Sequence, residues 1–63
     1  MDELKDYDVV ELTEPVGKMP AGSVGAIVHF YQGANDFEVE FVDENGITIS
    51  LEKVPKNKMK LKT

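Results

Sequence analysis

The residues of this chain that could do chemistry are few, and they gather in two neighbouring segments. His29 is the only histidine, and Glu38 and Glu40 follow it closely in the sequence. One imidazole and two carboxylates are ligand types that Zn²⁺ or Mn²⁺ accepts, and a carboxylate pair can act as general acid and base. A flat pair of strands, however, has neither the closed geometry nor the supporting partners of a metal site. We therefore expect no metal and no cofactor here.

Other patterns that are typical of catalysis are incomplete. The run Gly22-Ser23-Val24-Gly25 lacks the Gly-Lys-Ser/Thr ending and the following helix of a phosphate-binding loop. No serine or threonine lies in a nucleophile elbow or triad pattern. Asp43-Glu44-Asn45-Gly46 resembles the start of a calcium loop only in composition, because the spaced ligands and distal glutamate are missing. The sequence predicts a protein that is not an enzyme and has no catalytic residues.

The length and composition indicate one small domain. A 63-residue chain buries only about 60% of the surface that it exposes when unfolded, so we expect a single domain over residues 1–63 with a small core. There is no cysteine, and packing alone must therefore hold the fold. No apolar run approaches the roughly 18 residues of a membrane span, and the N-terminus is acidic, unlike that of a signal peptide. A soluble cytoplasmic protein is expected.

Five segments are predicted to be β-strands. Residues 37–42 alternate strictly between apolar and acidic types, and residues 47–51 alternate between aliphatic and hydroxyl types. Asn45-Gly46 between them is the preferred dipeptide of a type I′ hairpin turn. The remaining segments are rich in β-branched and aromatic residues or alternate with lysine. The five segments are 7–12, 24–31, 37–42, 47–51 and 58–62.

This layout predicts an all-β fold. Five short strands with a long first loop and tight later turns are typical of a small five-stranded SH3-like barrel. An OB-like barrel is the alternative, although it often places a helix between its third and fourth strands, where this chain has only a tight turn.

Three segments carry a resemblance to a known family. Tyr7–Leu12, Gly22–Val28 and Phe37–Asp43, taken in that order, resemble a family of small bacterial proteins known as domain of unknown function 4926. The similarity covers nearly the whole chain. It implies an SH3-like β-barrel without an established activity, and therefore no functional residues to carry over.

The expected strand register predicts one surface. We expect the aliphatic residues of 47–51 (Ile47, Ile49 and Leu51) to face the core, together with Ala26, Val28 and Phe30 from one strand and Phe37, Val39 and Phe41 from the next. The outer face then places His29 opposite Glu38 and Ile27 opposite Glu40, with Tyr31 and Val42 at its ends. A β-bulge at Gly25 would alter this arrangement at its start.

The charge distribution indicates the kind of partner. Residues 1–52 have a net charge of −10 and the last eleven residues a net charge of +5, within a total of −5. The predicted acidic and apolar face, composed of Ile27, His29, Tyr31, Glu38, Glu40 and Val42, favours a non-catalytic module that binds a basic protein. An antitoxin or an immunity protein is one such role.

Other binding roles are less well supported by composition. A weak nucleic-acid contact through Lys56, Lys58, Lys60 and Lys62 is the alternative, disfavoured by the acidic remainder of the chain. Self-association is a third possibility. The chain has no tryptophan, which argues against the aromatic groove of a proline-rich peptide binder.

Overall fold

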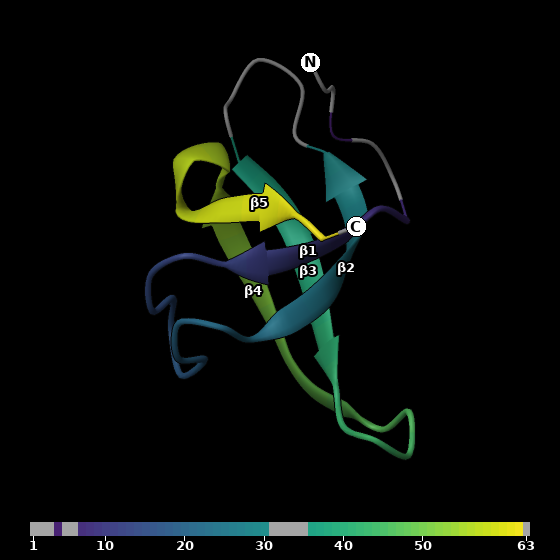
Figure 1. Ribbon diagram of the computed structural model, residues 1–63. Helices are drawn as coiled ribbons and strands as arrows, with labels where there is room; N and C mark the ends of the chain where they lie inside the picture. The colour runs from purple at the N-terminus through teal and green to yellow at the C-terminus, as the bar shows by residue number, and fades with distance from the viewer. Residues whose placement is uncertain (1–3, 5–6, 31–35, 63) are drawn as a thin grey trace.

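Five antiparallel strands form a single sheet in the order β4-β3-β2-β1-β5 (Figure 1). The structure is a computed structural model, and it describes residues 4, 7–30 and 36–62. A single turn of 3₁₀-helix, η1 (Lys56–Lys58), joins the last two strands. The strands are β1 (Val9–Leu12), β2 (Val24–Phe30), β3 (Asp36–Val42), β4 (Thr48–Pro55) and β5 (Met59–Leu61).

The all-β prediction is confirmed, and each predicted strand has a counterpart. The sheet curls around its core and is compatible with an SH3-like barrel, but β4 and β5 are its two edges and the sheet is not closed. The largest difference in boundaries is at β4, which continues to Pro55 instead of ending at Leu51. In the part of the chain that the structure describes, no helix is long and apolar enough to cross a membrane.

The core lies on the inner face of the sheet and uses every strand. Phe41, Leu12 and Ile27 are its largest fully buried side chains. The complete set of buried residues is Val10, Leu12, Ile27, Phe37, Val39, Phe41, Val54 and Met59. Strict alternation along β3 explains why the three predicted core residues of that strand are all confirmed.

The predicted facing of β2 is wrong over most of the strand, because a β-bulge lies at Val28. His29 pairs with Glu38 as predicted, but the register then shifts, and Ile27 pairs with Val39 instead of Glu40. An extra residue in one strand moves every residue beyond it to the opposite face. Ile27 is therefore fully buried, and its assignment to the outer face is corrected.

The three residues that were expected to face inward from β2 are affected in different ways. Ala26 and Val28 are only half-buried. Phe30 is exposed, although its ring lies against Phe37 with 4.8 Å between the ring centroids. Gly25 is buried on the inner face, two residues before Ile27. The bulge lies at Val28, so Gly25 does not mark it.

The predicted facing of β4 is also wrong. Ile47, Ile49 and Leu51 were expected in the core, and all three are exposed. Ser50 pairs with Phe41, whereas Thr48 pairs with Val42, which leaves Ile49 as an extra residue in a second bulge.

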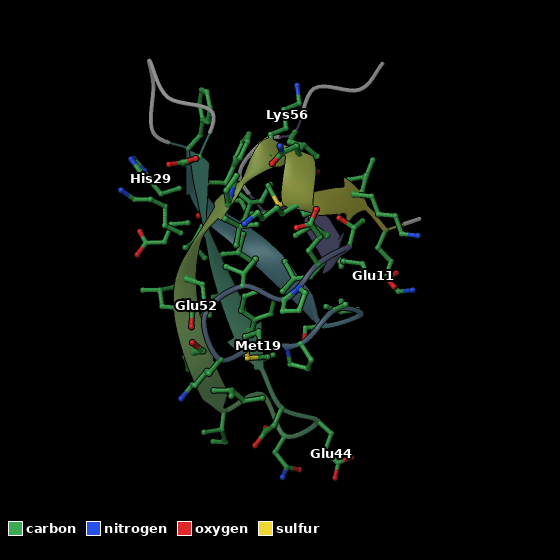
Figure 2. The ribbon with its side chains drawn as sticks, turned by 90° about the vertical axis from the view of Figure 1, so that its left-hand side faces the viewer. Glu11, Met19, His29, Glu44, Glu52 and Lys56 are labelled. Carbon is green, nitrogen blue, oxygen red and sulfur yellow. The ribbon has the colours of Figure 1, made fainter. Side chains whose placement is uncertain are left out.

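The β1–β2 loop packs against the core. Met19 and Val16 from this loop are partly buried against the core, and Glu52 of β4 points toward the same loop (Figure 2). A Cβ at Gly17 would overlap the Glu52 carboxylate, which also accepts a hydrogen bond from Ser50 Oγ. This contact explains how a charged residue occupies a position on the core side of β4.

Candidate protein-binding face

The candidate site is the outer face of the sheet, which we define as the surface opposite the buried core. Outward positions follow from the register, since directly paired residues share a face. Val9 pairs with Ala26, Ala26 with Glu40, and Glu40 with Leu51, so these four form one row across four strands. The adjacent row contains His29, Glu38 and Lys53. Both rows are continuous across β2, β3 and β4.

The predicted pairing of His29 with Glu38 is confirmed. His29 is exposed and Glu38 is half-buried, and they occupy directly opposed positions on β2 and β3. Lys53 lies opposite Glu38 on the other side, from β4. The carboxylate of Glu38 therefore belongs to a row that has a histidine and a lysine as its neighbours. Tyr31, which was predicted at the end of this face, lies outside the described residues.

Glu40 is at the centre of the face, between aliphatic neighbours. Its Oε2 accepts a hydrogen bond of 2.5 Å from Thr48 Oγ1. Ala26 and Leu51 flank it on the neighbouring strands, and Val42, two residues further along β3, is exposed as predicted. An anchored carboxylate surrounded by accessible apolar groups can form charge-assisted hydrogen bonds to a cation.

Sequence reasoning missed several exposed aliphatic residues of this face. Leu51 is 53% exposed and Ile49 is 43% exposed on β4. Val9 and Val24 are exposed on β1 and β2. The aliphatic alternation of residues 47–51 is present in the sequence, but it predicts that these side chains face the core. The bulge at Ile49, which no local pattern marked, turns Leu51 outward.

The net charge of the protein is concentrated on β3, β4 and the turn between them, which we call the β3–β4 hairpin (residues 36–55). It contains six acidic residues and one lysine, a net charge of −5, which equals the net charge of the whole chain. The other residues contain six acidic residues and six lysines and balance to zero. The turn of the hairpin projects beyond the other strands (Figures 1 and 2). The hairpin therefore presents a mainly negative field, with Lys53 as its one basic residue.

The C-terminal lysines lie at the opposite end of the sheet. Lys56 and Lys58 are on η1, and Lys60 pairs with Glu11 across the β1–β5 ladder. Lys62 Nζ lies 3.8 Å from Glu11 Oε1. Glu11 thus reduces the positive charge that Lys60 and Lys62 present. Among the described residues, no group of three or more potential ligands is close enough to hold a metal ion.

Comparison with protein-family models matches residues 6–61 to the family described as Domain of unknown function (DUF4926). Comparisons with curated proteins and with solved structures gave no match.

Proposed function

Since this chain belongs to the family described as Domain of unknown function (DUF4926), whose description gives no activity, we propose a function from the sheet surface: a non-catalytic module that binds a basic protein. The observation that carries the proposal is the composition of the outer face. Glu38 and Glu40 lie there beside exposed Val42 and Leu51. Carboxylates steer a cationic partner toward the surface, and aliphatic side chains supply the apolar area that is buried on contact.

The location of the net charge supports the same proposal. A surface with a net negative charge accelerates association with a basic protein and disfavours acidic ones. For the biological setting, we propose that the chain is the neutralising member of a toxin and antitoxin, or toxin and immunity, pair that acts in the cytoplasm. The argument for this setting is that a small acidic protein complements a basic toxin.

Removal of two charges from the face tests the proposal. The tagged chain is used to capture partners from its native host, and the affinity of a basic protein encoded beside its gene is then measured by calorimetry. We expect the double variant Glu38→Gln/Glu40→Gln to weaken binding about tenfold, equivalent to about 1.4 kcal/mol. This difference in affinity should become smaller as the salt concentration rises, because exposed charges are screened.

The matched control removes the same charge elsewhere. Glu3→Gln/Glu14→Gln neutralises two carboxylates in the N-terminal part of the chain. This control should change the affinity less than twofold. Equal effects of the two double variants would show that only total charge matters, and the outer face would then have no specific role.

A further inference from the structure

We propose that the basic partner binds by adding an extended segment of its own chain to the free edge of β4, with basic and apolar side chains alternating along that segment. This inference rests on the proposed function for the sign of the partner's charge. It adds the binding mode, the strand that is used and the pattern of the bound segment. Strand addition combines backbone hydrogen bonds, which supply affinity, with alternate side-chain contacts, which supply specificity.

Backbone geometry directs some hydrogen-bonding groups of β4 away from β3. The N–H of Ile27 donates to β1, so in the alternating pattern of an antiparallel sheet the backbone groups of Ala26 are directed at β3. Ala26 pairs with Glu40, and Glu40 pairs with Leu51 on β4. Following the alternation across β3, the N–H and C=O of Leu51 point away from β3. These are the groups that an added strand would pair with.

The edge strand β4 exposes aliphatic side chains on its outer face. Ile49 and Leu51 lie outside the core, whereas Ser50 and Glu52 occupy the core side of the same strand. An isolated edge strand that exposes its aliphatic residues is an aggregation hazard, and proteins usually protect such edges. A bound segment would cover Leu51 with the aliphatic stem of one of its basic side chains and remove this hazard.

Only part of the edge is suited to pairing. Pro55 ends β4, and Lys53 lies two residues before it. Proline and lysine in an edge strand both disfavour pairing with another strand. The segment from Thr48 to Glu52 has no such protection. The predicted contact is therefore short and is centred on Leu51.

The charge of the β3–β4 hairpin indicates which kind of segment binds the β4 edge. The β3–β4 hairpin has a net charge of −5, so pairing with a second copy would bring two hairpins of the same sign together. A basic segment instead gains from Glu40, which lies next to Leu51, and from the acidic turn at Asp43 and Glu44. Lysine and arginine side chains are long enough to cross from an added strand toward these carboxylates.

Amide hydrogen exchange with two designed peptides tests the binding mode. The probe is a nine-residue peptide of alternating valine and lysine, and its control has glutamate in place of lysine. We expect the lysine peptide to slow exchange of the Leu51 amide at least tenfold at saturation. The glutamate peptide should leave the exchange rate of this amide unchanged. Slower exchange confined to β2, or no binding of the lysine peptide, would overturn strand addition.

Two variants separate this inference from the proposed function. Leu51→Lys keeps the backbone and adds a repelling charge at the centre of the contact, so it should reduce peptide binding at least tenfold. Val9→Lys makes the same kind of change on the far side of the outer face and should reduce binding less than threefold. If the native partner loses affinity for the Glu38→Gln/Glu40→Gln variant but not for Leu51→Lys, the proposed function stands and strand addition is wrong. A concentration-dependent dimer that Leu51→Lys abolishes would assign the edge to a second copy and contradict the inference.

Discussion

Gly25 on β2 lies directly opposite Phe41 on β3, and the Phe41 ring occupies the space that a side chain at position 25 would need. A Cβ built on Gly25 would come within 2.8 Å of both Phe41 Cδ1 and the Glu40 carbonyl oxygen. The glycine therefore allows a fully buried aromatic ring to pack against the backbone of the neighbouring strand. This packing, rather than a bulge, explains the glycine in an otherwise apolar strand.

Substitution of this glycine should be costly. We expect Gly25→Ala to lower the free energy of unfolding by about 1–3 kcal/mol, because neither the backbone oxygen nor the buried ring can move freely. The measurement is urea denaturation. Gly22→Ala is the control, since position 22 has a φ of +92° but open space around it, and only the backbone strain of about 1–2 kcal/mol applies. A Gly25→Ala protein as stable as the wild type would contradict the packing described here.

Tyr7 offers a route to a more stable protein. It is the only described residue besides glycine with a positive φ, 73°, and its ring is 81% exposed. Asparagine tolerates this backbone conformation better than tyrosine, and little buried area is lost. We expect Tyr7→Asn to raise the stability by up to about 1 kcal/mol, or about 4–8 °C in Tm for a domain of this size. Tyr7→Val, which is β-branched, should lower Tm, and the opposite order of the two variants would show that the ring itself contributes.

The β3–β4 turn depends on one aspartate. Asp43 Oδ1 accepts hydrogen bonds from the backbone N–H of Asn45 at 2.8 Å and of Ile47 at 3.0 Å. We expect Asp43→Ala to destabilise the protein by about 1 kcal/mol, which is typical for the loss of such a side-chain cap. Thermal unfolding would measure it. Glu44→Ala, an exposed neighbour for which no hydrogen bond is described, should shift Tm by less than half as much.

The exposed aliphatic residues of β4 should matter little to the stability of the free protein. We expect Ile49→Thr/Leu51→Thr to change the free energy of unfolding by less than about 0.5 kcal/mol, because both residues are exposed and threonine suits a strand. Ile27→Ala, by contrast, should cost about 2–5 kcal/mol, since Ile27 is fully buried. Comparable losses in the two variants would place Ile49 and Leu51 in the core, as their alternation first indicated.

The strands and turns could be predicted from the sequence because their signals are local. The alternation of Phe37, Val39 and Phe41 with acidic residues placed β3, and Asn45-Gly46 located the turn after it. The expected type I′ geometry is wrong, because only Gly46 and not Asn45 has a positive φ. The bulges could not be predicted in this way. An extra residue at Val28 or at Ile49 follows from how several strands fit around one core, and no pattern within a single strand marks it.

The candidate site was predicted in part for the same reason. His29 lies opposite Glu38 because the register near Phe30 was correct. Glu38, Glu40 and Val42 are outward because β3 alternates without a break. Ile27 was misplaced by the bulge at Val28. Leu51 was missed because an outward aliphatic residue has the same sequence signal as an inward one, and only the register of β4 distinguishes them.

The most direct test of the binding mode is amide exchange at Leu51 with the lysine and valine peptide bound. Because the Leu51 N–H points away from β3, it should exchange quickly in the free protein and at least tenfold more slowly in the complex. Exchange at Leu51 that is unchanged by the saturating peptide, while His29 or Glu38 amides respond, would contradict binding at the β4 edge.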